Sequence, residues 1–428
     1  MPQTPSKATV RMYNVGFGDC FLLTFHYATP PGDQHILIDF GTLAGGADMA
    51  GIAQEIHDTC GGKLYAVIAT HRHRDHISGF SDKGGAKSSG AIIASCKPRM
   101  VLQPWTENPD AGADDTSAPL LAKGKNKLTD KQLFFASMNA MSAFAEAAAI
   151  YAKRWPEVGG RGRMIGKLAV NNVKNPEAVA NLRTMAPKNK VRFLQFGSPS
   201  GLESATLLPG VKVHVLGPPT LEAANIRKYA KKSPEYWLSC KYWAMQAAGN
   251  SGPQSRALFP RGPRVPADSR PFHVRWFIDR AENAFKRNLL DIVNILDSFM
   301  NNTSLILLFE FNGKKLLFPG DAQLENWTYA LSQPGVKALL SDVDLYKVGH
   351  HGSRNATPKV LWEGFEKRKS KHAASVLKTM MSTRAGAYEK SEEGKVPATN
   401  LVTALKADSD LLNTQDLKAK RGPIVETF

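Results

Sequence analysis

The chain has 428 residues, of which 43% are hydrophobic, and its 55 lysines and arginines against 38 aspartates and glutamates give a formal net charge of +17. This apolar fraction is enough for a sizeable core and excludes wholesale disorder, while the charge favours a polyanionic partner, either nucleic acid or an acidic membrane surface. Four cysteines without paired short spacing exclude a cysteine-rich zinc module and give no hint of a disulfide framework.

Residues 1–103 are expected to form the first half of a fold from strands and short helices. The segment Gly16-Phe17-Gly18-Asp19 marks a tight turn between the first two strands, and Asp48 is the expected N-cap of a helix over 48–59. An apolar strand leads directly into His71. The strands expected in this part are 8–13, 20–26, 34–40, 64–70 and 100–103.

Two stretches with helical character interrupt the strands. Residues 104–190 and 220–300 are expected to be largely helical insertions, and the second contains a Pro- and Arg-rich loop at 250–271 that is expected to be exposed and mobile. Residues 191–219 and 301–428 are expected to supply the remaining strands, which suits two packed sheets with helices outside. The further elements expected are strands at 191–196, 211–216, 304–311, 315–318 and 345–348 and a helix at 399–405.

The strongest chemical signal is the run from His71 to His76, which places three imidazoles and a carboxylate within six residues at the end of an apolar strand. In an extended segment His71, His73 and Asp75 point the same way, and His76 joins them only if the chain turns there. Neutral imidazoles and carboxylates suit zinc or manganese and leave positions for water and substrate. The alternative is a surface histidine cluster that binds no metal.

This run resembles the HxHxDH motif of the metallo-β-lactamase superfamily, and other parts of that pattern recur in order. They are Asp39 in Leu-Ile-Asp-Phe-Gly, Asp321 in Leu-Phe-Pro-Gly-Asp, and His350 and His351 in Lys-Val-Gly-His-His-Gly-Ser. The segments 14–20 and 301–305 resemble the hydrolase-like domain of the ComEC-type competence DNA-uptake channel. The resemblance spans residues 14–353 and implies an α+β fold, the four-layer αββα metallo-β-lactamase sandwich. The two insertions have no counterpart in it.

The resemblance also implies two divalent metal ions, zinc or manganese, with Asp321 bridging them. Asp75, Asp39 and His351 are expected to take catalytic or orienting roles. One of the two adjacent histidines is expected to ligate metal and the other to orient substrate, and His350 is favoured as the ligand because it follows the glycine at the strand end. The expected metal ligands are His71, His73, Asp75, His76, Asp321 and His350. His214 lies where many relatives supply a further ligand, but strand alternation turns it away from the valines beside it.

The expected reaction is hydrolysis by a metal-activated water, and a phosphodiester substrate fits best. Arg72 and Arg74 lie inside the metal motif, where guanidinium groups meet phosphate oxygens well. Basic clusters recur at 154–167, 228–237, 256–275 and 367–371, and most of them lie beside aromatic residues. Such interleaving suits a nucleic-acid backbone with bases stacked nearby, so a nuclease is expected. The residues expected to contact substrate are Arg72, Arg74, Asn302, Ser304 and Ser353.

Two other functions stay open at this point. One is a small-molecule ester or phosphodiester hydrolase, such as a lactonase, a phosphorylcholine esterase or a cyclic nucleotide phosphodiesterase. The other is a nucleic-acid-binding protein with a degenerate metal site. The sequence lacks a signal peptide and a membrane-length apolar run, so a cytoplasmic protein without a membrane partner is expected. A regulatory partner or protease acting on 250–271 is a further hypothesis, and the oligomeric state is open.

Overall fold

The computed structural model describes residues 3–43, 47–108, 175–219, 300–372, 375–384, 396–417 and 422–428. The chain divides into two compact units, and all described residues belong to the unit formed by 1–110, 174–227 and 298–428. The other unit, 111–173 and 228–297, lies outside the described residues. Most of the two expected helical insertions and the whole loop at 250–271 lie outside the described residues and stay predictions, as do the domain boundaries; of the first insertion, 104–108 and 175–190 are described.

The first sheet has seven strands in the order β13-β1-β2-β3-β4-β5-β6. Strands β13 to β3 pair antiparallel, whereas β3 to β6 pair parallel, so the sheet is mixed. Its strands are β1 (Lys7–Met12), β2 (Cys20–His26), β3 (Gln34–Phe40), β4 (Ala66–Ile68), β5 (Met100–Pro104), β6 (Val191–Leu194) and β13 (Ile424–Thr427).

The second sheet has six strands in the order β12-β11-β10-β9-β8-β7, and it is also mixed, with β12 to β9 parallel and β9 to β7 antiparallel. Asn312 and Gly313 turn the β8–β9 hairpin with positive φ angles of 44° and 70°, as their sequence predicts. The strands are β7 (Lys212–Gly217), β8 (Ile306–Phe311), β9 (Lys314–Phe318), β10 (Leu345–Lys347), β11 (Lys378–Met381) and β12 (Asp410–Asn413).

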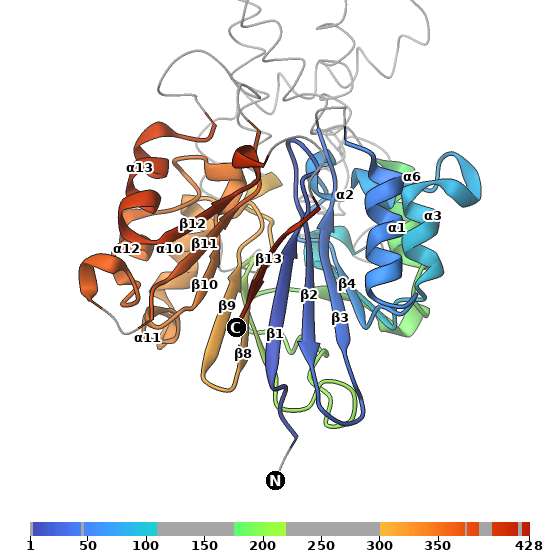
Figure 1. The fold of residues 1–428 in the computed structure, drawn as a ribbon, viewed down its shortest axis with the longest axis horizontal. Coiled ribbons are helices and arrows are strands. Elements are labelled where there is room, and N and C mark those ends of the chain that lie inside the picture. Colours follow the sequence, from blue (N-terminus) through green and yellow to red (C-terminus); the bar gives the residue numbers. More distant parts are fainter. Residues whose placement is uncertain are drawn as a thin grey trace, which may run out of the picture. The chain divides into compact units, whose positions relative to one another are not determined.

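Helices cover the outer face of each sheet (Figure 1). Beside the first sheet are α1 (Met49–Thr59), α2 (Arg74–Ile77), α3 (Ser89–Ser95) and α6 (Pro176–Thr184); beside the second are α10 (Leu324–Ser332), α11 (Val336–Ser341), α12 (Lys359–Gly364) and α13 (Thr399–Asp408). Asp48 caps α1 as predicted, since its Oδ1 accepts a hydrogen bond from the Gly51 N–H at 2.9 Å. Short 3-10 helices span Ser78–Phe80, Gly85–Lys87, Trp105–Glu107, Lys188–Lys190, Gly349–Gly352, Lys369–Lys371 and Thr414–Asp416.

Apolar side chains pack on both faces of both sheets, which explains why central strands such as β2, β3 and β8 contain consecutive apolar residues. In β2, Phe21 and Leu23 face the second sheet, while Leu22 faces the helices beside the first. In β8, Leu307 packs between the sheets and Leu308 packs against the outer helices. Each such side chain contributes roughly 1.5–3 kcal/mol by leaving water. These layers are compatible with the predicted αββα sandwich.

The strand directions bring several chain segments to one edge of the sandwich. The carboxyl ends of β3 and β4 lie at the same edge because these strands are parallel, and the start of β2 lies there too because β2 runs antiparallel to β3. The same relation holds for the ends of β9 and β10 and the start of β8. A hydrogen bond from the Leu305 N–H to the Thr70 carbonyl, 2.9 Å long, joins the two edges. Residues at these ends therefore meet.

Among the described helices none combines the length and apolar character that crossing a membrane requires. Cys20, Cys60 and Cys96 are buried free thiols. The cytoplasmic location stays a prediction.

Candidate metal centre

The histidine-rich run begins at the end of β4 and then turns. The chain enters α2 at Arg74, and the His76 N–H donates a hydrogen bond to the His73 carbonyl at 3.0 Å. This turn carries the His76 ring to 4.1 Å from the His71 ring, while the His71 and His73 ring centroids lie 4.7 Å apart. The sequence predicted that His76 would join the other histidines only if the chain turned there, and this turn is present.

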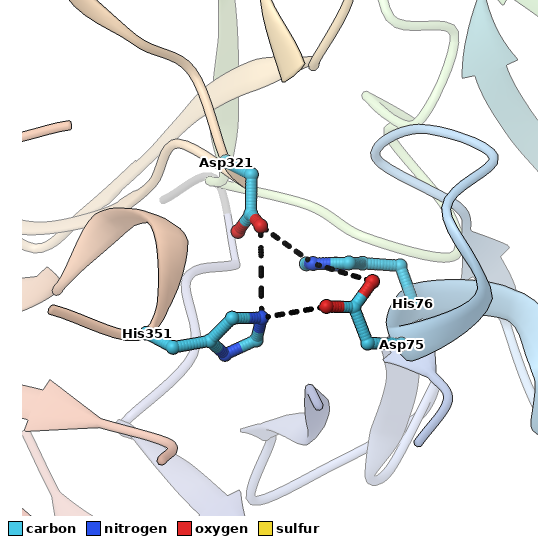
Figure 2. Close-up of side chains that lie close together, drawn as sticks. All are labelled: Asp75, His76, Asp321 and His351. Atoms are coloured by element: carbon cyan, nitrogen blue, oxygen red, sulfur yellow. Dashed lines mark hydrogen bonds and ion pairs between the residues drawn. The ribbon is translucent and has the colours of Figure 1, made fainter. Parts of the chain in front are cut away.

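Four of the residues from the motif pattern form a compact buried group, which we call the metal-facing group: Asp75, His76, Asp321 and His351. One donor atom from each lies within 4.8 Å of all the others. The His76 Nε2 lies 3.0 Å from the Asp321 Oδ2, and the His351 Nε2 lies 3.1 Å from the Asp75 Oδ2 (Figure 2). Figure 2 shows Asp75 and His76 reaching the group from α2, and Asp321 and His351 reaching it from two other segments of the chain. Two imidazoles and two carboxylates thus face one another.

The imidazoles of the group form hydrogen bonds through Nδ1, so that their Nε2 atoms face the centre of the group. The His76 Nδ1–H donates to the Asp39 Oδ2 at 2.8 Å, and the His351 Nδ1–H donates to the Ser382 carbonyl at 3.0 Å. The His71 Nδ1 lies 3.2 Å from the Thr70 Oγ1, and its buried Nε2 has no hydrogen-bond partner. Metal-ligating histidines are anchored in this way through the nitrogen that does not bind the ion. The donor set therefore fits a divalent metal.

Asp39, at the end of β3, accepts hydrogen bonds from Thr70 and His76. Its Oδ1 accepts from the Thr70 N–H and its Oδ2 from the Thr70 hydroxyl, each at 2.7 Å, in addition to the bond from His76. The backbone nearby is closely packed, because a Cβ on Gly41 would lie 2.5 Å from the His76 nitrogen. Only glycine at position 41 allows the end of β3 to approach α2 so closely.

The two adjacent histidines after β10 have different positions. Both have left-handed backbone conformations, with φ angles of 46° at His350 and 53° at His351, which cost roughly 1–2 kcal/mol per non-glycine residue and tend to occur at functional sites. His351 is fully buried in the metal-facing group. His350 has a side chain that is 16% exposed, and its Nε2 lies 3.9 Å from the Asp321 Oδ2. The structure therefore brings His351, and not His350, into the group.

Sequence reasoning missed two buried residues, Asp19 and Lys347. The Lys347 ammonium forms ion pairs with the Asp19 Oδ2 and, at 3.4 Å, with the Asp321 Oδ1, and it donates to the Gly320 carbonyl at 2.9 Å. We call Asp19, Lys347, Asp321 and the Gly320 carbonyl the lysine-held group. A signal was present, because a lysine inside an apolar strand such as β10 needs a buried carboxylate partner.

Asp19 also lies behind the histidines. Its Oδ1 is 3.4 Å from the His351 Nδ1, and its Oδ2 is 3.7 Å from the His76 Nδ1. Asp19, Asp39 and His76 form a second buried group whose donor atoms lie within 4.8 Å of one another, so two overlapping groups of histidine and aspartate could hold metal ions.

The charges of the centre shift the pKa values of its members. Burial lowers the pKa of His351, but the carboxylates of Asp321 and Asp19 outweigh it and raise the pKa to about 10. Burial raises the pKa of Asp75, but the imidazoles of His76 and His351 bring it down to about 2. Burial and the neighbouring histidines hold the pKa of His71 well below its usual value, so that imidazole is neutral. The carboxylates of Asp75 and Asp321, whose pKa values are lowered, are thus ionised and require compensating protons or a cation.

The two arginines of the motif differ in exposure. The Arg72 side chain is 19% exposed, and its Nε lies 3.8 Å from the Oε1 of buried Glu107. Arg74 is exposed. The basic cluster at 367–371 is largely paired with carboxylates, since Lys367 binds Asp344 and Arg368 binds Asp408. The other three basic clusters lie outside the described residues.

The predicted polar contacts support the site from its edges. The Ser304 hydroxyl accepts a hydrogen bond from the Asp321 N–H at 3.2 Å, and the Asn302 Oδ1 accepts from the Gln323 N–H at 3.2 Å. The Ser353 hydroxyl donates to the Asn355 Oδ1 at 2.8 Å. In these contacts all three residues shape the loops, and their predicted contact with substrate stays untested.

His214 lies away from this centre, as strand alternation predicted. Its side chain is 31% exposed on β7, and its Nε2 lies 2.9 Å from the Oε2 of Glu310 on the neighbouring strand β8. It therefore supplies no ligand to the metal-facing group.

No protein-family model matches the sequence, and no curated protein matches it either. What the structure supports is two mixed sheets and a buried histidine and aspartate cluster, consistent with a metallo-β-lactamase-like fold. This cluster is a candidate site for metal-dependent chemistry.

Proposed function

We propose that this protein is a metal-dependent hydrolase of the metallo-β-lactamase fold, related to the ComEC-type hydrolase-like domain, that cleaves phosphodiester bonds of DNA or RNA. One observation carries the proposal. Asp75, His76, Asp321 and His351 place four donor atoms within 4.8 Å in a buried position, with both imidazoles anchored through Nδ1. Such anchoring is typical of metal ligands rather than of structural histidines.

The residues of the centre would have different roles in the proposed reaction. Asp75, His76, Asp321 and His351 would hold one ion. His71 and His73 belong to neither of the two groups of donor atoms within 4.8 Å, and we propose that they would hold a second ion together with Asp321. Divalent ions there supply Lewis acidity and lower the pKa of a bound water. Asp39 fixes the His76 ring through the bond to Nδ1, and the Ser304 hydroxyl fixes Asp321 through its backbone N–H. We expect His350, whose side chain is partly exposed, to contact a substrate oxygen.

A polyanionic substrate is favoured by the charge of the chain. A formal net charge of +17 raises the local concentration of nucleic acid and speeds its association. The basic clusters at 154–167, 228–237 and 256–275 carry much of this charge, and they favour a long nucleic-acid substrate over a small one.

A small-molecule phosphoester or ester hydrolase is the second candidate. The position of Arg72 favours it, because the guanidinium already lies near the Glu107 carboxylate and the adjacent Arg74 is exposed. Such an enzyme needs no long basic groove, so its rate would change little with salt, whereas nucleic-acid binding weakens steeply as salt rises.

Cleavage of labelled single- and double-stranded DNA and RNA, with added Mn²⁺ or Zn²⁺, tests the proposal. We expect cleavage by the intact chain and none by His73→Ala or Asp321→Ala. His214→Ala is the matched control, because it removes a partly exposed imidazole away from the centre, and it should keep full activity. Metal binding without cleavage of any polymer would direct attention to small phosphoesters. Metal content well below one ion per chain would favour a nucleic-acid-binding protein with a degenerate site.

A further inference from the structure

The interior of the second sheet contains a lysine that the proposed reaction does not use. Lys347 ends β10, has only 2% of its surface exposed, and lies between Leu345 and Tyr346 on one side and the His350–His351 turn on the other. Burying an ammonium is costly unless carboxylates and hydrogen-bond acceptors surround it. The partners of Lys347 therefore indicate what it does.

These partners are all oxygen atoms. The ammonium contacts the Asp19 Oδ2, the Gly320 carbonyl at 2.9 Å and the Asp321 Oδ1 at 3.4 Å. Two carboxylates and a main-chain carbonyl are ligands that a hard divalent cation such as Mn²⁺ prefers. The lysine thus lies where the oxygen atoms around it would otherwise suit a metal ion.

The two carboxylates come from opposite halves of the fold. Asp19 precedes β2 in the first sheet, and its backbone N–H donates to the Asp75 carbonyl at 2.9 Å. Asp321 follows β9 in the second sheet. Lys347 therefore joins the two sheets' edges directly behind the metal-facing group. It shares the Asp321 Oδ1 with the His350 backbone N–H, which donates at 3.1 Å, while the Oδ2 faces His76 and His351.

We propose that the Lys347 ammonium is the resident cation of the lysine-held group: it takes the position between Asp19, the Gly320 carbonyl and Asp321 that a divalent ion would otherwise fill, and so confines added metal to the other side of Asp321. Lys347 is a positioning residue in this role. The inference rests on the metal centre of the proposed function and is independent of its substrate.

The test counts the ions that each variant binds. Metal-stripped wild type, Lys347→Met, Asp19→Asn/Lys347→Met and Lys315→Met are titrated with Mn²⁺, and free Mn²⁺ is followed by electron paramagnetic resonance. Methionine is one atom shorter than lysine and leaves the ammonium position itself empty. Lys315 is the matched control, since its ammonium likewise binds a carboxylate, at Asp342, and a carbonyl, at Leu339, but away from the centre.

We expect Lys347→Met to bind one more Mn²⁺ ion per chain than wild type, and Lys315→Met to bind the wild-type number. The double variant should lose the extra ion, because Asp19 is then a neutral amide, and should bind the remaining metal about 10–100-fold more weakly, as loss of an outer-shell partner typically causes. An unchanged or lower ion count in folded Lys347→Met would overturn the proposal.

If metal-free Lys347→Met does not fold, the same titration is read as metal-induced folding by circular dichroism. The proposal then requires Mn²⁺ to restore the wild-type spectrum. No recovery at saturating Mn²⁺, while the double variant folds, would contradict it. Because none of these measurements uses cleavage, a failure of the nuclease proposal leaves this test unaffected.

Discussion

The two oxygens of the Asp321 carboxylate face environments of opposite character. On the Oδ2 side, the imidazoles of His76 and His351 lie at 3.0 and 3.6 Å, and on the Oδ1 side the ammonium of Lys347 lies at 3.4 Å. An imidazole can give up its proton to bind a metal ion. The Lys347 ammonium keeps its proton: burial alone would lower its pKa, but the carboxylates of Asp19 and Asp321 raise the pKa above its usual value. On our two proposals, the charge of the metal-facing group would be balanced by an exchangeable cation, and that of the lysine-held group by the fixed Lys347 ammonium.

The largest expected effect follows from removing the carboxylate that both groups share. Asp321→Asn keeps the shape but removes the charge, so we expect Mn²⁺ affinity to fall by more than the roughly 10–100-fold that loss of an outer-shell partner costs. Isothermal titration calorimetry measures it. Asp342→Asn is the control, because that carboxylate pairs with Lys315 away from the centre. Wild-type affinity in Asp321→Asn would place the ion elsewhere.

The metal-facing group should also make the stability of the metal-free protein depend on pH. The pKa of His351 is raised from 6.5 to about 10 by the carboxylates around it, so its imidazolium stabilises the metal-free fold fully below pH 6.5, and this contribution is lost as pH rises toward about 10. Denaturant midpoints of chelator-treated protein should fall across this window. Bound Mn²⁺ should reduce the fall, because the ion replaces the proton. Parallel pH curves with and without metal would count against the exchange.

A smaller effect distinguishes the two adjacent histidines. His351→Ala removes a buried member of the metal-facing group, and His350→Ala removes a ring at its partly exposed rim. We expect Mn²⁺ affinity to fall at least tenfold more in the first variant than in the second, by analogy with the roughly 10–100-fold changes seen for supporting residues. Calorimetry on both variants decides this, and equal losses would mean that both rings ligate.

The smallest effect concerns stability alone. Gly41→Ala would place a Cβ 2.5 Å from the His76 nitrogen, so we expect a loss of about 1–3 kcal/mol, as for other overpacked sites. Gly364→Ala is the control, because a Cβ there meets nothing within 4 Å. Urea denaturation measures both free energies of unfolding. A Gly41→Ala protein as stable as wild type would show that β3 and α2 can move apart.

Much of the fold was readable from the sequence because its central strands are buried on both faces. The predicted bounds of β2 and β3 coincide with those observed, and the Asn312-Gly313 hairpin is where it was expected. Strands β11, β12 and β13 were missed. The residues of the edge strands β12 and β13 are mostly half-buried or exposed, so their apolar pattern is weak. Strand β11 is a run of only four residues, Lys-Thr-Met-Met, with two apolar side chains.

The candidate site was partly readable. The run from His71 to His76 could be recognised as a candidate metal motif by its residue types. Asp321 could be recognised by its position directly after a strand. Asp19 could not be recognised as a partner of Lys347, because the pairing depends on two sheets that meet only in the folded chain. The choice between His350 and His351 depends on two left-handed backbone angles, which no residue pattern in this segment specifies.

The separation of the ligands along the chain has a consequence for the order of folding. Asp75 and His351 lie 276 residues apart, so bringing them together in the unfolded chain has a large cost in loop-closure entropy. A metal ion would therefore find this ligand set only after both sheets have docked, unlike the ion of a small zinc module, whose ligands are neighbours in sequence. Its binding free energy adds to the stability of the finished fold. We thus expect metal to bind late and not to nucleate folding.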